Sequence, residues 1–154
     1  KEIVQLASDY PTSSFNIIGS GPYKEKLEDY NLSNIILHGF LDHNNINLIF
    51  QESDLMFLPS RSEGFPKVIL EAASAGIPSI VYNTYGASHW MEHNHNGFIA
   101  ANLDDVKIII NGLIDNPKLL RITSEGAVKL AQRFDWKNVI KDWEVVINEL
   151  YNGK

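Results

Sequence analysis

Short apolar runs alternate with amphipathic segments along most of the chain, and this alternation restricts the fold more than any other feature. The predicted strands are residues 14–19, 34–39, 54–60, 79–83 and 97–100, and the helices between them are 23–31, about 46–53 and 66–75. The length of the apolar runs and the Gly and Pro residues beside them favour strands. From about Asp104 the pattern is helical to the end. Strands that alternate with helices pair in parallel, so we predict an α/β fold, a Rossmann-like open parallel sheet with helices on both faces.

Composition restricts the class of protein further. The 154 residues have the length of one domain, which we predict to be single. The chain has no cysteine, which excludes disulfides and Cys-based metal sites and fits a reducing compartment. A net charge of −6, with scattered lysines, argues against nucleic-acid binding. No apolar stretch approaches the ~20 residues of a membrane span, and no signal peptide is visible. The chain starts without Met and already in a helical pattern, which indicates a piece of a longer protein.

The loops that follow the strands are where a ligand is expected. In open parallel sheets, ligands bind outside the carboxyl ends of the strands. The loops at these ends are residues 19–22, 38–44, 59–66 and 83–89.

The segment SRSEGFPKVILEAASAGIP, residues 60–78, places a predicted helix start directly after one of these strands. Pro66 suits the first helical position, because its φ is already helical and its missing N–H is no loss there. The backbone N–H groups of Lys67 and Val68 then have no partner inside the helix, and the helix dipole favours an anion beside them. Gly64 lets a ligand approach the backbone closely.

Two glutamates flank this helix start. Glu71 lies little more than a turn inside the helix, and its side chain leans back toward the N-terminus. Glu63 precedes the helix and would reach the same ligand from the other side. Carboxylates beside a phosphate-binding helix start suit a sugar nucleotide, with phosphates on the amides and hydroxyls on the glutamates. Glutamates at this spacing also arise by chance, and a solvated Glu71 paired with Lys67 is the structural alternative.

The stretch LPSRSEGFPKVILEAASAGIPSIV resembles the signature of retaining glycosyltransferases with the two-domain GT-B fold. This large family (group 1, or family 4-like) includes sucrose-synthase-like and mannosyltransferase-like enzymes, and its donor domain carries two glutamates separated by seven residues in this setting. Further stretches resemble other parts of the domain in the same order: FNIIGSGPYKEKL, IILHGFLDHNNINLIFQESDLMFLPS, NHNGFIA and RFDWKNVIKDWEVVINELY.

The resemblance implies roles for residues around the two glutamates. Glu71 matches the glutamate that binds the ribose hydroxyls of the nucleotide. Glu63 matches the one that holds the donor-sugar hydroxyls, and we assign it the catalytic role. Four residues match the turn and helix start of the family, which present backbone amides to the sugar and diphosphate: Gly64, Phe65, Lys67 and Val68.

Two further matches concern the earlier strand ends. Phe40 and Leu41 match the loop that contacts the base, and Gly19 and Gly21 match the turn that lines the same cleft. The stretch GSGP is not the dinucleotide fingerprint, because Lys24 occupies the third Gly position. From the residues alone, a plain strand-to-helix turn stays as an alternative to ligand contact there.

The resemblance implies the donor-binding domain of an enzyme that transfers a hexose-type sugar from an NDP-sugar to a glycan, lipid or other acceptor. It implies no metal and no cofactor beyond the donor substrate. The Arg and Lys that bind the donor phosphates in the family, and the acceptor-binding N-terminal domain, precede the first residue of this chain. We therefore expect the chain alone to be inactive. The family often builds cell-surface polysaccharides at the membrane, which implies a cytoplasmic location with peripheral membrane contact.

The chain also departs from the family pattern. Many members have Gly-Gly and then Glu where this chain has Tyr85-Gly86 and then His89, so no role is assigned to His89. The cluster of His89, Glu92, His93 and His95 invites a metal site, and His89 and His93 would share a helical face. It lacks the His-Glu-x-x-His order and a third ligand at helical spacing, so no metal site is predicted.

Three other residues receive structural interpretations. Trp136 and Trp143 lie seven positions apart in the last predicted helix, the spacing of one core-facing stripe, and are expected to pack. Asp135 is expected to cap that helix.

Two rival functions stay open. A nucleotide-sugar epimerase or a phosphorylase on the same fold would need different partner residues outside this chain. A non-catalytic, flavodoxin-like binding module is the rival from another class, although a phospho-receiver would carry acidic residues at its strand ends. The strand ends here read Gly-Ser-Gly, His-Gly and Pro-Ser.

Overall fold

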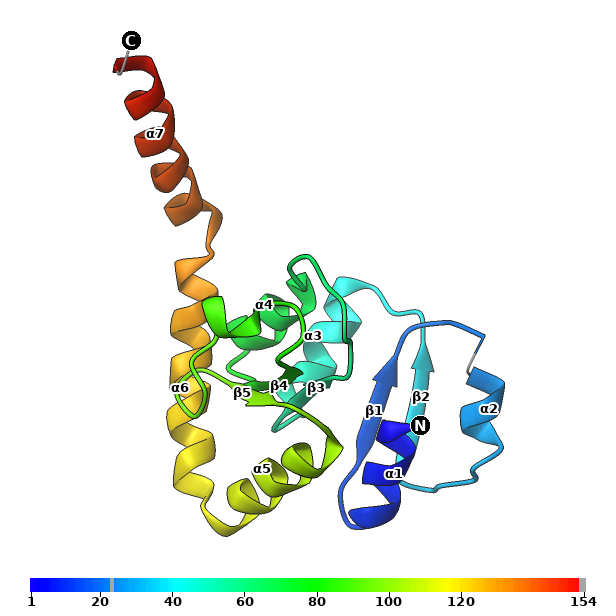
Figure 1. Ribbon diagram of the computed structural model, residues 1–154. Helices are drawn as coiled ribbons and strands as arrows, with labels where there is room; N and C mark the ends of the chain where they lie inside the picture. Colours follow the sequence, from blue (N-terminus) through cyan, green and yellow to red (C-terminus); the bar gives the residue numbers. More distant parts are fainter. Residues whose placement is uncertain (23, 153–154) are drawn as a thin grey trace. The chain divides into compact units, whose positions relative to one another are not determined.

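Strands and helices alternate in the computed structural model much as the apolar pattern predicts (Figure 1). The structure describes residues 1–22 and 24–152, so Tyr23, the predicted start of the second helix, lies outside the described residues. The chain divides into two units, Lys1–Ser53 and Asp54–Lys154, and the strands of each pair in parallel. The predicted α/β class is confirmed, with a two-stranded sheet in the first unit and a three-stranded sheet in the second. That residues 1–154 form a single domain stays a prediction.

The first unit places β1 (Phe15–Ile18) beside β2 (Ile35–Gly39) and adds α1 (Glu2–Asp9), α2 (Lys24–Glu28) and α3 (His43–Gln51). The side-chain amide of Asn34 donates to the carbonyl oxygens of Ala7 (2.9 Å) and Ser13 (3.0 Å), which ties the segment around the end of α1 to the start of β2. Asp42 begins α3 by accepting a hydrogen bond from the Asn45 N–H (2.9 Å). The parallel pairing of β1 with β2, from Phe15 opposite Ile35 to Ile18 opposite Gly39, places their carboxyl ends side by side.

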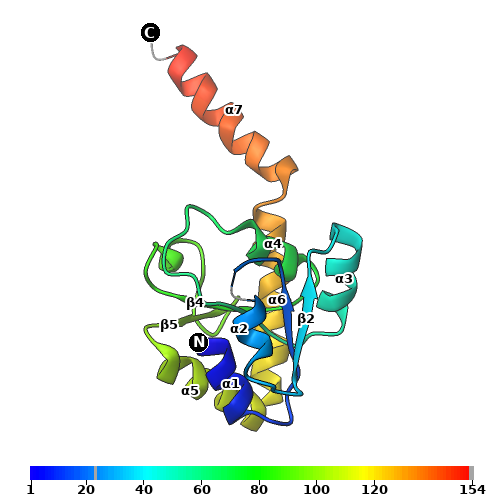
Figure 2. The same ribbon diagram turned by 90° about the vertical axis from the view of Figure 1, so that its right-hand side faces the viewer.

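The second unit is built on β4 (Ser79–Tyr82), which lies between β3 (Met56–Leu58) and β5 (Phe98–Ala100). All four residues of β4 are buried. Helices cover both faces of this sheet: α4 (Lys67–Ser74) lies on one side and α5 (Leu103–Asp115) on the other (Figure 1 and Figure 2). A parallel strand enclosed in this way is apolar at its centre, as Ile80 and Val81 are.

Helix α6 (Pro117–Arg133) packs so closely that one position accepts only glycine. A Cβ atom on Gly126 would lie 1.9 Å from the carbonyl oxygen of His95, in the turn that precedes β5. The same helix holds the end of α4, because the Ser124 hydroxyl donates to the carbonyl of Gly76 (2.7 Å). Gly76 has φ +79°, in the left-handed region that glycine adopts without strain. Helix α6 therefore fixes α4 within the second unit.

The last helix, α7 (Trp136–Asn152), extends away from the three-stranded sheet of its unit in both views (Figure 1 and Figure 2). The predicted cap is confirmed, since the Asp135 carboxylate accepts a hydrogen bond from the Lys137 N–H (2.9 Å). The predicted packing of Trp136 and Trp143 is wrong: their exposed fractions are 71% and 62%. Helix α7 is amphipathic, but no other part of the described chain covers the apolar face that carries the two tryptophans. No described helix is both long enough and apolar enough to cross a bilayer.

We predict that Gly126→Ala destabilises the second unit by about 1–3 kcal/mol, the usual cost of forcing extra volume into a packed contact. The free energy of unfolding is measured by urea denaturation followed by tryptophan fluorescence, since all tryptophans lie in this unit. Gly112→Ala in α5 is the matched control, because its Cβ would meet no atom within 4 Å. There we expect a gain of about 0.5–1 kcal/mol. Equal stabilities of the two variants would contradict the packing described for α6.

Candidate functional site

The loop between β3 and α4, residues 59–66, is held at both ends by aromatic contacts. Near its start, the Arg61 guanidinium lies 4.3 Å from the centre of the Tyr82 ring, at the end of β4. Near its end, the Phe65 ring lies 5.1 Å from Trp90 and 4.9 Å from Phe134, measured between ring centroids. The backbone between these contacts carries Glu63 and Gly64, so its position is set by packing although both residues are exposed.

The start of α4 differs from the prediction by one residue. Pro66 is the N-cap, with an extended backbone (φ −78°, ψ 99°), and Lys67 is the first helical residue. The first bond of the helix runs from the Ile69 N–H to the Pro66 carbonyl (3.0 Å). The helix therefore offers no carbonyl to the N–H groups of Lys67 and Val68, as predicted. Both N–H groups, with the positive end of the helix dipole, suit an anion at this point.

The two predicted glutamates lie on either side of this helix start. Glu63 is exposed in the loop, and Glu71 is half-buried on α4. The structural alternative for Glu71 was an ion pair with Lys67 on the same helix. Among residues 1–22 and 24–152, no such ion pair forms.

Sequence reasoning missed Tyr85, which lies in the loop after β4. Its ring packs against the buried cluster of Ile69, Val81, Ala87 and Met91. Its hydroxyl oxygen is buried, and the described part of the chain supplies it with no hydrogen-bond partner. Burial raises the pKa of the Tyr85 phenol above its ordinary value of 10.0, and the negative charge of Glu63 raises it further. The only signal in the sequence was a tyrosine where the family pattern has a glycine.

The histidines that follow have structural contacts. His89 ends the short 3-10 helix η1 (Ala87–His89), so the helical face predicted for His89 and His93 does not exist. Instead, Nδ1 of His93 accepts a hydrogen bond from the Ile99 N–H (3.0 Å), at the middle of β5. Nδ1 of His95 lies 3.5 Å from the Glu92 carboxylate, and both side chains are exposed. In the described ranges, no three His, Asp or Glu side chains gather as metal ligands would.

In the first unit, two glycine turns meet at the carboxyl ends of β1 and β2. Gly19 has φ +126° and Gly39 has φ +68°, and the Gly19 N–H donates to the Gly39 carbonyl (2.7 Å). Phe40 is 84% exposed just beyond Gly39, and Leu41 is half-buried. The predicted residues of this unit are thus brought to one edge of the sheet.

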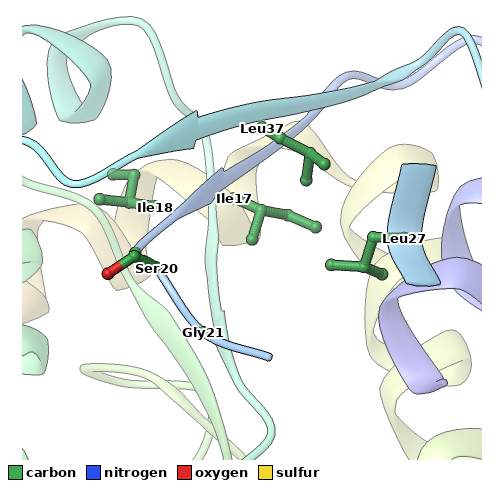
Figure 3. A pocket seen from close by; sticks show the side chains of 7 residues that line it. Ile17, Ile18, Ser20, Gly21, Leu27 and Leu37 are labelled. Atoms are coloured by element: carbon green, nitrogen blue, oxygen red, sulfur yellow. The ribbon is translucent and has the colours of Figure 1, made fainter. Parts of the chain in front are cut away.

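A cavity of about 220 Å³ opens beside these turns (Figure 3). Its walls come from β1, β2, α2 and the turn after β1: Ile17, Ile18, Gly19, Ser20, Gly21, Leu27 and Leu37. The two predicted turn glycines, Gly19 and Gly21, therefore line a hollow with mostly apolar walls.

The ten predicted site residues fall into two groups. Those of the first unit are Gly19, Gly21, Phe40 and Leu41, and those of the second are Glu63, Gly64, Phe65, Lys67, Val68 and Glu71. Each group lies at the carboxyl ends of the parallel strands of its own unit, where ligands of such sheets bind. Their contact with a donor stays a prediction.

Comparison with known proteins identifies relatives. A family model described as glycosyl transferases group 1 matches residues 2–130. A Haemophilus influenzae protein, named an uncharacterized glycosyltransferase, is 27% identical over 150 residues, which are 92% of this chain and 42% of that protein. An Escherichia coli protein named UDP-Gal:alpha-D-GlcNAc-diphosphoundecaprenol alpha-1,3-galactosyltransferase is 31% identical over 152 residues, 92% of this chain and 37% of that protein. The chain thus spans less than half the length of either relative.

Solved structures share the fold. Anabaena HepE in complex with UDP and glucose superimposes with a TM-score of 0.80 at 23% identity, over 96% of this chain and 44% of that one. Sucrose-phosphate synthase from Thermosynechococcus elongatus gives a TM-score of 0.83 at 19% identity, over 99% of this chain and 42% of that one. Together with the family model, these structures confirm the resemblance that the sequence carries.

We predict that Phe65→Ala destabilises the second unit by about 1–3 kcal/mol, because it removes the aromatic contacts with Trp90 and Phe134, each of which contributes about 0.5–1.5 kcal/mol. Urea unfolding monitored by tryptophan emission gives the free energy. Ile114→Ala is the matched truncation, since Ile114 is 60% exposed on α5, and we expect a change within about 0.5 kcal/mol. If Phe65→Ala is as stable as Ile114→Ala, the ring contacts do not hold the loop.

Proposed function

The chain belongs to the glycosyl transferases of group 1, and on this premise we propose that it is the nucleotide-sugar-binding domain of a retaining glycosyltransferase. The observation that carries the proposal is the start of α4, with its two uncommitted N–H groups between Glu63 and Glu71. The named ligands of related structures support it, since Anabaena HepE was solved with UDP and glucose and with UDP-glucose.

We assign the diphosphate to the helix start. The N–H groups of Lys67 and Val68 would donate to its oxygens, and the helix dipole would stabilise the negative charge that grows on the leaving nucleotide. Gly64 has no atom within 4 Å of its Cβ position, which leaves room for a ligand against the backbone. Catalysis by this chain is then electrostatic: its residues hold and stabilise the leaving group.

The two glutamates would divide the hydroxyl groups of the donor. Glu71, half-buried on α4, would accept hydrogen bonds from the ribose. Glu63, in the exposed loop, would accept them from the hexose and orient its anomeric carbon, which is the catalytic role assigned to it. For the base, we assign the contact to Phe40 and Leu41, with Gly19 and Gly21 in the neighbouring turn at the strand ends of the same unit.

The wider reaction is transfer of a hexose-type sugar to a glycan, lipid or other acceptor, without a metal. The Escherichia coli relative supports this class, because its name gives a UDP-sugar donor, a lipid-linked acceptor and an alpha linkage. An alpha linkage made from an α-linked donor retains the anomeric configuration. We propose that a further domain of a longer protein binds the acceptor, at the cytoplasmic face of a membrane.

We predict that UDP, GDP or ADP shifts the backbone amide NMR signals of Lys67, Val68 and residues 39–41 in a titration of this chain. Glu71→Gln should weaken binding about tenfold or more, since a hydrogen bond to a charged group contributes about 1.5–3 kcal/mol. Glu144→Gln, an exposed carboxylate on α7, is the control and should leave the affinity unchanged. No shift with any nucleotide at millimolar concentration would contradict donor binding by this chain.

We also predict that this chain alone transfers no sugar from UDP-glucose and releases no UDP from it. Among residues 1–22 and 24–152 we identify no covalent nucleophile beside a base, and the acceptor site is assigned to another domain. Released UDP is measured by a coupled assay over hours. Turnover above that of the Glu63→Gln variant would show that the chain is sufficient for chemistry.

A further inference from the structure

The loops after β3 and β4 are in contact with each other in the second unit. Their strands pair in parallel from Met56 opposite Ser79 to Leu58 opposite Val81, so both loops leave the sheet at the same edge. The Phe65–Trp90 ring contact then joins the two loops, with 5.1 Å between centroids. The loop after β4 therefore lies against the loop that carries Glu63.

Tyr85 lies in this loop after β4. Its ring packs on the cluster that includes Ile69, from the first turn of α4, and Val81, from β4, which fixes where the phenol oxygen lies. That oxygen is buried, and within residues 1–22 and 24–152 no group pairs with it. A buried hydroxyl without a hydrogen-bond partner raises the free energy of the folded chain. A hydrogen bond that forms with this hydroxyl during ligand binding therefore favours binding.

Glu63 has the chemistry of that partner. Its side chain is exposed in a loop, so the carboxylate can change rotamer, and an ionised carboxylate accepts hydrogen bonds without donating any. Its charge is close enough to raise the pKa of the Tyr85 phenol, in addition to the larger effect of burial. A phenol is protonated at neutral pH at its ordinary pKa of 10.0, and the upward shift only adds to this, so the Tyr85 hydroxyl is a donor.

We propose that Tyr85 is a positioning residue for Glu63: its O–H donates a hydrogen bond to the Glu63 carboxylate when the donor sugar is bound, and so directs the second carboxylate oxygen at the sugar hydroxyls. The inference rests on the proposed function. It adds a residue that the family pattern does not assign, at the place where that pattern has a glycine. The sugar contact of this protein then depends on two loops.

The test compares the affinities of the chain for UDP-glucose and for UDP. Tyr85→Phe, which removes only the hydroxyl, should weaken UDP-glucose binding about tenfold and leave UDP binding unchanged. Glu63→Gln should weaken UDP-glucose binding at least as much, because it also changes the acceptor of the sugar hydroxyls. The double variant should bind no more weakly than Glu63→Gln alone, because the effect of Tyr85 passes through Glu63. Tyr151→Phe is the matched control, at an 84% exposed tyrosine of the same unit.

Two outcomes overturn the proposal and leave the proposed function standing: Tyr85→Phe binds UDP-glucose as the unmodified chain does, or the effects of the two variants simply add. A failure of the proposed function is different, because the unmodified chain then binds no nucleotide. In that case the phenol titration of Tyr85, followed by tyrosine ring-carbon NMR, decides whether the Glu63 charge lies close enough to the phenol for the two side chains to pair. Glu63→Gln should lower the phenol pKa and Glu144→Gln should not; no change in Glu63→Gln removes the proximity that the pairing requires and so refutes the proposal.

Discussion

The contact of the Phe65 ring with Trp90 and Phe134 is the interaction on which the candidate site depends. A loop of exposed polar residues has little to hold it in one conformation, because solvent competes for each of its hydrogen bonds. Phe65 is the last residue before the N-cap of α4. Its large ring packs against the loop after β4 and against the end of α6. The polar groups of Glu63 and Gly64 are positioned by an apolar neighbour.

The sequence alone predicted the strands and helix starts that depend on neighbouring residues in the chain. Strand runs such as NII and SIVY, with Gly or Pro beside them, predicted each strand to within two residues at each end. The start of α4 followed from Pro66, and the start of α7 from Asp135. The error at Pro66 was one position, and its cause is local: the residue has a helical φ and an extended ψ. Sequence fixes the φ of proline but leaves its ψ to the surroundings.

What the sequence did not predict depends on contacts between distant segments. The spacing of Trp136 and Trp143 indicates an apolar face, but periodicity alone does not show what covers that face. The role of His93 required the path of the chain back to Ile99, which places a backbone N–H against its ring. The importance of Tyr85 depends on the packing of its ring against the cluster that contains Ile69 and Val81, and these residues are distant in the sequence. In each case the sequence shows the residue type but not the segment that it contacts in the folded chain.

The charge at the start of α4 supports an anion there on grounds separate from family membership. Lys67 is an exposed cation in the first helical position, where the dipole opposes positive charge by about 0.3–1 kcal/mol. The described residues offer it no ion pair, with Glu71 or any other carboxylate, that would offset this cost. An exposed lysine in that place lowers the stability of the helix. A diphosphate at this point would be attracted by both the lysine and the dipole, and these two attractions would offset the repulsion between them.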